Sequence, residues 1–555
     1  MNKIFLASTF LGAFCLFSNP SKAQLMRAKD LYSKADSLRG QLTPLRTCYD
    51  VQYYHLDVKV DIDKKFISGS NLFKFKAVND FNKLQFDLFD NLSVDKVEYK
   101  GKELKFTREF NAVFITFPQT IKKGSIDSFK VYYSGNPIQA TRAPWDGGFD
   151  WKTDSNGKPF VATAVQGLGA SAWWPTKDHQ TDEPDSMLVS VSVPKDLMNV
   201  SNGRLIKVDE RKDGYTTYHW RVTNPINNYN ISLNIGDYVL HKEKIKSEDG
   251  PLNVHYYILR ENDVEEKREH LRKNVAQTIK AFEYWFGPYP FYEDNYKIVE
   301  TAHLGMEHQS AIAYGNKYQN GYLGRDGSNT GWGKKWDFIV VHESGHEWFG
   351  NNITSKDLGD MWIHESFTNY SEALFIEYFY GKEAGQAYVH GNRKGILNDK
   401  PMQGPYHVNK EGSGDMYVKG GVFLNMLRSI IDDDAKWRFI LRGLNKDFRH
   451  SQVDYNDILR YISKHSSIDF SKVFEQYVQN VSLPTLEIQF NEDGQAYARW
   501  QTNVKDFNMY IHLGKDKPSQ RLLLTDSFTK LNIEGLNKAN LAIDTFNYYI
   551  QVKVQ

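Results

Sequence analysis

The chain has 555 residues, of which 41% are hydrophobic and 25% charged, a composition typical of folded globular proteins. This length is too great for one hydrophobic core, so we expect about two to four domains. The formal net charge of +1 excludes the kind of excess charge that would by itself draw the chain to nucleic acid or to a membrane surface.

The N-terminus predicts a signal peptide over residues 1–23. A positive start at Lys3 is followed by an apolar run from Ile4 to Phe17, and small residues lead to an expected cleavage point after Ala23. The run has 14 residues, fewer than the ~20 needed to span a bilayer; an uncleaved anchor or a buried helix is the alternative. We therefore expect export to the periplasm or the extracellular space, with no integral membrane segment in the mature chain.

Cleavage at this point would remove one of the two cysteines. Cys15 would leave with the signal peptide and Cys48 would stay, so no internal disulfide is possible. Loss of Lys3 and Lys22 would change the net charge from +1 to −1, still close to neutral. Stability is then expected to come from hydrophobic cores and from any bound metal.

Residues 24–245 predict an N-terminal antiparallel β-domain with a short polar helix as lead-in over 25–42. In "YYHLDVKVDID" (53–63), apolar residues such as Leu56 and Val58 alternate with charged ones, which is typical of a half-buried strand. Similar short stretches, separated by Gly, Asn and Asp turns, recur as far as "YNISLNIGDYVLH".

The pattern changes to helical spacing near residue 260. "VEEKREHLRKNVAQTIKAFEYWFG" carries apolar residues at helical intervals and ends on Gly287. Helical patterns continue to about 480, and strand patterns return after Pro484. We therefore expect a catalytic domain over 246–482 and a small C-terminal β-domain over 483–555, which makes the fold a multidomain α+β architecture.

"KKWDFIVVHESGHEWFG", a helical segment expected to end at Gly350, contains a candidate zinc site. His342 and His346 are four residues apart, so their side chains differ by about 40° around the helix and leave from one face. Two imidazoles at this spacing can reach one Zn²⁺ at ~2.0–2.1 Å. Glu343 is turned to the side, where it can hold a water molecule. This is the H-E-x-x-H pattern of metalloproteases, although the pattern alone also occurs on solvated helix faces.

A catalytic zinc needs three protein ligands and an open position, so a third ligand is expected nearby. "GDMWIHESFTNYSEALFIEYFYG" is strongly helical and contains Glu365, nineteen residues after His346. Glu365 could instead be an exposed helical glutamate. Its apolar neighbours Met361, Trp362 and Ile363 argue against that, because a buried carboxylate needs a partner.

These residues resemble those of the gluzincin peptidases and, among them, the M1 aminopeptidase family. The resemblance covers roughly 48–480 and rests on four ordered places: "YYHLDVKVD" with "VQGLGASAWWPTKDHQTDEPDS", "LGMEHQSAIAYG", "HESGH" with "WIHES", and "DMYVKGGVFLNMLR". It implies a thermolysin-like, mainly helical catalytic domain behind an N-terminal β-domain.

The resemblance also implies roles for the metal-site residues. His342, His346 and Glu365 would hold one Zn²⁺, and Glu343 would act as the general base for an attacking water molecule. Tyr417 matches the tyrosine that stabilises the transition state. Its alternative role is that of one more packing aromatic among the 33 tyrosines.

Four further positions match substrate-binding residues of the family. Glu307 corresponds to the carboxylate that recognises a free α-ammonium group, so peptides with a free N-terminus are the expected substrates. Gln166 corresponds to a β-domain residue that contacts the same amine or the first carbonyl, although it could equally be a turn residue. Gly305 and Met306 would line the cleft through their backbones.

The sequence departs from the family pattern in three places. His308 and Gln309 follow Glu307, where the family usually has Asn first. His364 replaces an Asn that normally bonds a zinc histidine; we expect His364 to do the same, although it could titrate or bind metal itself. Glu372 is a further candidate for such a bond, or a plain surface charge. Only about 70 β-like residues follow the catalytic domain, where many relatives have a large helical domain.

The leading interpretation is an exported zinc aminopeptidase. The alternatives are a zinc endopeptidase, which Glu307 argues against, epoxide hydrolysis as in one branch of the family, and a catalytically idle binding protein on the same scaffold. No nucleic-acid partner is expected. The sequence leaves the oligomeric state and the preferred first residue open.

Overall fold

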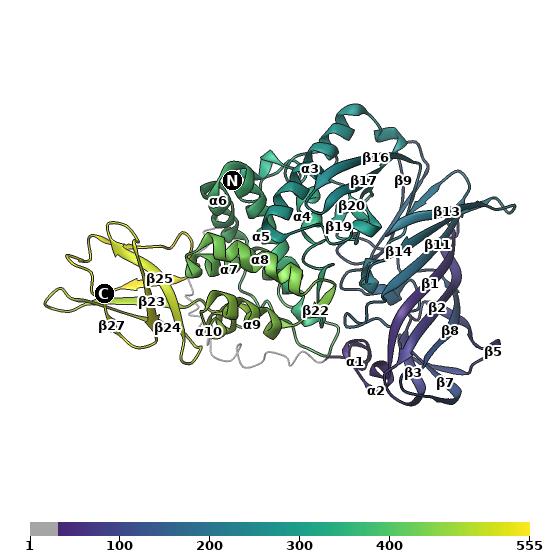
Figure 1. Ribbon diagram of the computed structural model, residues 1–555, viewed down its shortest axis with the longest axis horizontal. Helices are drawn as coiled ribbons and strands as arrows, with labels where there is room; N and C mark the ends of the chain where they lie inside the picture. Colours follow the sequence, from purple (N-terminus) through teal and green to yellow (C-terminus); the bar gives the residue numbers. More distant parts are fainter. Residues whose placement is uncertain (1–31) are drawn as a thin grey trace, which may run out of the picture.

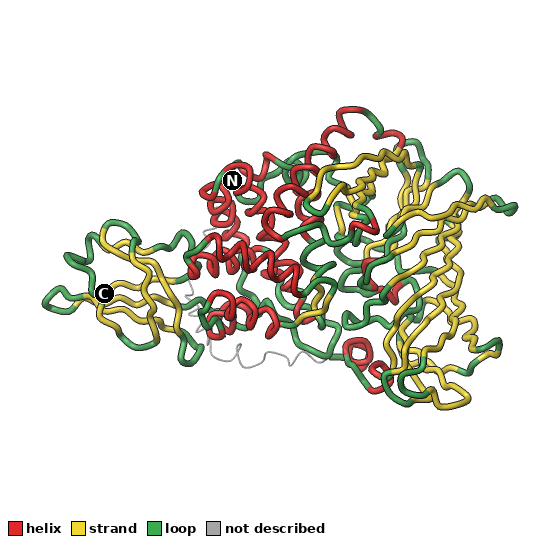
Figure 2. Tube along the Cα trace, viewed as in Figure 1, coloured by secondary structure: helices red, strands yellow, loops and turns green. Residues whose placement is uncertain are grey.

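The computed structural model describes residues 32–555, so the predicted signal peptide over 1–23 lies outside the described residues. The molecule is elongated, with a β-rich region at one end, helices in the middle and a small β-domain at the other end (Figure 1). Figure 2 shows this order as strands at both ends with helices between them. The predicted multidomain α+β architecture is confirmed. Within residues 32–555, no helix has both the length and the apolar character needed to cross a membrane.

The described chain begins with two short helices, α1 (Lys34–Gly40) and α2 (Pro44–Thr47). The Ser33 side chain caps α1 by accepting a hydrogen bond from the backbone N–H of Asp36. The Asp36 carboxylate in turn accepts a hydrogen bond from the backbone N–H of Ser33. α1 lies inside the lead-in helix predicted over 25–42, and α2 follows that segment.

A large mixed sheet forms the N-terminal domain. Its strands are, in spatial order, β13 (Arg204–Glu210), β14 (Tyr215–Val222), β11 (Ser186–Pro194), β1 (Tyr49–Asp61), β2 (Phe66–Ala77), β8 (Ile126–Gly135), β4 (Leu92–Tyr99) and β5 (Lys102–Glu103). The alternation in β1 is as predicted, because Leu56, Val58 and Val60 are fully buried. The sheet is not purely antiparallel, since β1 runs parallel to β11. The other described pairings of this sheet are antiparallel.

Two smaller sheets complete the N-terminal domain. One contains β3 (Phe81–Asp87), β7 (Ala112–Ile121) and β6 (Phe106–Glu109); the other contains β12 (Met198–Val200), β15 (Asn234–Gly236), β10 (Pro159–Ala164) and β9 (Gly148–Thr153). Their apolar faces join one core with the large sheet, and that core includes Trp173, Trp174 and Trp220. After β10 the chain turns at Gln166 and Gly167, where Gly167 has φ +70°.

The central region starts with a five-stranded sheet. Its order is β16 (Tyr238–Ser247), β17 (Gly250–Leu259), β18 (Tyr296–Glu300), β20 (Ile312–Tyr314) and β19 (Gly305–Met306). The predicted boundary at 245/246 falls inside β16, which pairs with β17 along its whole length. β19 carries the "GM" of the "LGMEH" segment at the edge of this sheet.

Helices make up most of the central region, together with one small parallel strand pair. They are α3 (Glu265–Phe286), α4 (Phe338–Gly345), α5 (Trp362–Tyr380), α6 (Lys382–Asn392), α7 (Val418–Ile431), α8 (Asp434–Asp447), α9 (Tyr455–Ser466) and α10 (Ser471–Val478), with β21 (Ile353–Ser355) paired to β22 (Ser451–Val453). α5 packs against α4, α6 and α7, which makes it the centre of the helical layer.

α4 is shorter than the sequence predicts, because it ends at Gly345 and not at Gly350. Its last turn tightens: the N–H of Glu347 donates to the carbonyl of Ser344, three residues back. His346 keeps helical dihedrals, with φ −65° and ψ −23°, so it still shares a face with His342.

The C-terminal domain consists of two sheets. The first contains β27 (Thr529–Lys530), β24 (Ala496–Gln501), β23 (Thr485–Phe490) and β29 (Gln551–Val554); the second contains β26 (Gln520–Thr525), β25 (Asn508–Lys515) and β28 (Leu541–Ile543). Its core is continuous with that of the helical region. Arg393, directly after α6, donates to the carbonyls of Thr545 and Phe546, and these bonds connect the C-terminal domain to the helical region.

Candidate metal centre

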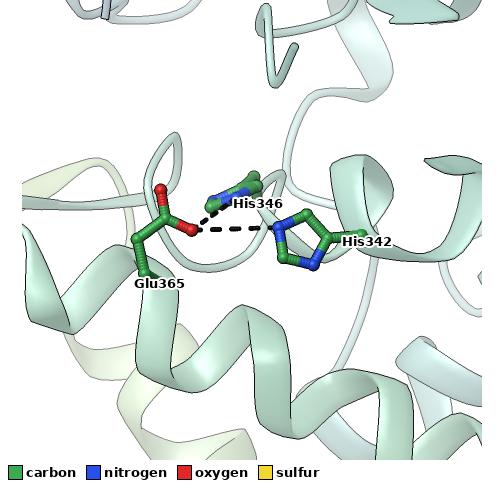
Figure 3. A group of neighbouring side chains, drawn as sticks. All are labelled: His342, His346 and Glu365. Atoms are coloured by element: carbon green, nitrogen blue, oxygen red, sulfur yellow. Dashed lines mark ion pairs between the residues drawn. The ribbon is translucent and has the colours of Figure 1, made fainter. Parts of the chain in front are cut away.

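The three predicted metal ligands meet between α4 and α5. α4 carries His342 and the residue that follows its end is His346, while the first turn of α5 carries Glu365 (Figure 3). The Nε2 atoms of His342 and His346 lie 3.8 Å and 3.4 Å from Glu365 Oε2. The ligand atoms of all three residues lie within 4.8 Å of one another, and all three residues are buried.

The free atoms of this group fit a zinc ion. Glu365 Oε2 is buried and has no hydrogen-bond partner among residues 32–555, so a strong acceptor near the two imidazoles is left unused. The other ring nitrogens are already engaged: His342 Nδ1 lies 2.7 Å from Glu372 Oε1, and His346 Nδ1 lies 3.0 Å from the carbonyl oxygen of Phe349. Both Nε2 atoms are therefore left for a metal, and two imidazoles with one carboxylate form a ligand set of catalytic zinc sites.

The charges around the imidazoles favour a cation at this point. Burial lowers the pKa of His346, but Glu365, Glu307 and Glu343 outweigh it and raise this pKa to about 10. The same contacts act on the Glu365 carboxylate. Burial raises the pKa of Glu365, but His346 and His342 outweigh burial and lower this pKa to about 2. The site thus stabilises positive charge between acidic groups, which is the role that a divalent ion fills.

Glu372, and not His364, bonds a histidine of the metal centre. Glu372 Oε1 accepts from His342 Nδ1, and its Oε2 accepts from the hydroxyl of Tyr388 at 2.7 Å. His364 Nε2 instead accepts from the backbone N–H of Ser355 at 2.8 Å. The expectation for His364 is therefore wrong, because its ring turns away toward β21. Burial lowers the pKa of His364 to about 3, so the ring is neutral.

We expect Glu372→Gln to weaken zinc binding by about 10-fold or more, because the carboxylate fixes the His342 ring and makes it a stronger ligand. The measurement is a zinc titration against a competing chromophoric chelator. Glu383→Gln, an exposed change on α6, is the matched control. An unchanged dissociation constant in Glu372→Gln would show that the bond to His342 does not support the metal.

The metal centre opens into a cavity of about 480 Å³. Glu343 lies in its wall, and an oxygen of Glu343 and one of Glu307 lie within 4.8 Å of a ring nitrogen of His346. Gly305 lies beside it: a Cβ atom at this position would come within 2.7 Å of Glu343 Oε1, so a side chain here would displace the carboxylate. Met306 is buried beside it and also lines the cavity.

Glu307 and Gln166 come together across two domains. Gln166 Nε2 donates to Glu307 Oε1 at 2.6 Å and to Glu365 Oε1 at 3.1 Å. Two further residues, which the sequence analysis did not identify, bond to Glu307. The hydroxyl of Tyr229 donates to Glu307 Oε1 at 3.0 Å, and Asn351 Nδ2 donates to the backbone carbonyl of Glu307 at 2.9 Å. No local sequence signal marks them, since both contacts span long stretches of chain.

Tyr417 also reaches the metal centre. It lies between a short 3₁₀ turn (Gly414–Met416) and α7. Its hydroxyl donates to Glu365 Oε1 at 3.0 Å, and its ring stacks on that of His342 with centroids 6.2 Å apart. Burial, together with Glu365 and Glu307, raises the pKa of Tyr417 well above its usual value, so the group remains a hydrogen-bond donor.

The two residues after Glu307 lie away from the ligands. His308 is fully buried, neither of its ring nitrogens has a described partner, and burial lowers its pKa to about 3. Gln309 donates through Nε2 to the carbonyl of Pro225 at 2.9 Å. Both side chains belong to the packing between the two domains.

Two family models match the chain. The Peptidase family M1 domain matches residues 272–477, and the Peptidase M1 N-terminal domain matches residues 50–229. Aminopeptidase N of Lactobacillus helveticus is 24% identical over 505 residues, which cover 84% of this chain and 54% of that protein. Probable aminopeptidase 1 of Sulfurisphaera tokodaii is 22% identical, with 86% of this chain and 60% of that protein covered.

The chain thus spans only 54% and 60% of the length of these curated relatives. Among solved structures, a mutant M1 zinc metallopeptidase from Deinococcus radiodurans, bound to a Tyr-Ser-Ala substrate, has a TM-score of 0.67 to this chain at 20% identity. The match covers 81% of this chain and 98% of that one. The similarity establishes a common fold.

Proposed function

The chain belongs to peptidase family M1, and from this membership we propose that it is a zinc-dependent aminopeptidase that releases N-terminal residues from peptides. The observation that carries the proposal is the contact of Gln166 with both Glu307 and the metal-site carboxylate Glu365, at 2.6 Å and 3.1 Å. A substrate's α-ammonium group is a cation with several donors, and it is best bound by a fixed carboxylate near the metal.

We infer that Glu307 also closes one end of the cleft. It is 2% exposed and is backed by Tyr229 and Asn351. A peptide that continued past this point would have to displace buried, hydrogen-bonded groups, which is costly. This closed end favours an exopeptidase over an endopeptidase with the same metal.

The positions of these side chains support the proposed catalytic roles. One Zn²⁺ held by His342, His346 and Glu365 would act as a Lewis acid toward the scissile carbonyl and lower the pKa of a bound water. Glu343, in the cavity wall, accepts a proton from the attacking water and passes it to the leaving amine. The hydroxyl of Tyr417 donates to the negative charge that develops on the carbonyl oxygen.

Hydrolysis of one peptide with a free N-terminus and of the same peptide N-acetylated, each with and without a chelator, tests the proposal. We expect cleavage of the free peptide alone, loss of cleavage with chelator and recovery with Zn²⁺, because acetylation removes the charge that Glu307 binds. Equal cleavage of both peptides would identify an endopeptidase. Zinc-loaded protein that cleaves no peptide of a varied set would favour a binding protein.

A further inference from the structure

One carboxylate in the cleft has no role in the chemistry described so far. Five glutamates line the cavity, at 307, 343, 365, 372 and 411, and no lysine or arginine of the described residues lines it. The first four bind, position or transfer protons as described above. Glu411 has no hydrogen bond or ion pair within residues 32–555.

The chain holds Glu411 beside the substrate-binding residues. Asn409 Nδ2 donates to the carbonyl of Gly167 at 3.2 Å, which ties the segment before Tyr417 to the β-domain turn. A Cβ atom at Gly167 would lie 2.7 Å from Glu411 Oε1, and Gly167 has φ +70°, so glycine permits both the turn and the approach of the carboxylate. The preceding residue is Gln166, which contacts Glu307.

An unpaired, half-buried carboxylate is unfavourable unless a cation joins it. Burial, followed by the charges of Glu365 and Glu307, raises the pKa of Glu411 to about 7. Lys400 opposes this shift, but its ammonium group forms no ion pair with Glu411. A positive group placed beside Glu411 would favour its charged form, so a cationic group of the substrate is the partner that this position lacks.

Two positive groups of a substrate could come here, its α-ammonium and a basic side chain. Glu307 and Gln166 are bonded to each other beside the metal ligands and suit the α-ammonium. Glu411 forms no hydrogen bond to either of them, so it suits a group further from the scissile bond. Aromatic walls of the same cavity, among them Trp145 and Tyr322, can pack on the alkyl part of a long side chain.

We propose, on the basis of the aminopeptidase function proposed above, that Glu411 binds the cationic side chain of a substrate's first residue and gives the enzyme a preference for N-terminal lysine and arginine. The carboxylate forms an ion pair with the ammonium or guanidinium group inside the cleft, where solvent screens it less than at the surface.

The test compares lysine with norleucine, which has the same chain length and no charge, as aminoacyl 4-nitroanilides with full-length, zinc-loaded protein. We expect the ratio of kcat/KM for lysine to that for norleucine to fall by about 10- to 100-fold in Glu411→Gln, the effect of one lost charged hydrogen bond. Glu411→Asp should keep part of the preference. Glu383→Gln, at an exposed position of α6, is the matched control.

The outcomes separate this inference from the function on which it rests. If wild type cleaves both substrates and the ratio is the same in Glu411→Gln, the inference is wrong and the aminopeptidase function stands. If Glu411→Gln loses both activities equally, Glu411 serves the α-ammonium or the fold, and the inference is again wrong. If wild type cleaves neither substrate nor any free peptide, the proposed function fails and the inference fails with it.

Discussion

Glu343→Gln should lower kcat/KM for peptide hydrolysis by about 10²- to 10⁴-fold while zinc content stays at the wild-type level. Glutamine keeps the shape of the side chain but cannot accept a proton from the attacking water. Burial raises the pKa of Glu343 to about 7, against the opposing charges of His342 and His346, and a bound divalent cation would lower it again.

The measurement is steady-state hydrolysis of a free peptide, with metal content determined on the same preparation. Glu383→Gln should match wild type, since this residue lies exposed on α6. If Glu343→Gln kept more than about a tenth of wild-type kcat/KM with full zinc, another group would have to be the base and the assignment of Glu343 would be wrong.

His346→Ala should abolish stable zinc binding and reduce hydrolysis to background, a larger effect than loss of the base. It removes one of three ligands and leaves Glu365 buried beside a single imidazole. Zinc at about 100 times its Kd should stabilise the wild type by about 2.7 kcal/mol, and this stabilisation should disappear in the variant.

Two readouts test this without relying on activity: metal content after dialysis, and the shift of Tm on adding Zn²⁺. His390→Ala, an exposed histidine of α6, controls for the loss of an imidazole elsewhere. A His346→Ala protein that keeps one zinc per chain and the wild-type Tm shift would contradict this ligand set. It would equally contradict the second group of possible ligands, Glu307, Glu343 and His346, because both groups contain His346.

The positions of strands were predictable from the sequence where apolar and polar side chains alternate. The neighbouring strands with which they pair were not predictable. Val58 is buried and Asp57 exposed in β1 because successive side chains of a strand leave on opposite faces, a property of the local backbone. The parallel pairing of β1 with β11 joins residues 53–59 to 186–192. The sequence pattern of a half-buried strand is the same for either direction of its neighbour, so only the assembled sheet decides it.

The sequence by itself predicted the three residues that meet at the candidate metal centre. A spacing of four residues from His342 to His346 sets both imidazoles on one face because the helix has 3.6 residues per turn, and the apolar surroundings of Glu365 pointed to a buried carboxylate. The tertiary structure decided what surrounds them: Glu372 and not His364 bonds His342, Gln166 meets Glu365 across 199 positions of chain, and Glu411 lies against Gly167. The physical reason is the separation of the residues along the chain. Helix geometry depends on residues a few positions apart, whereas these contacts depend on how loops from different domains pack together.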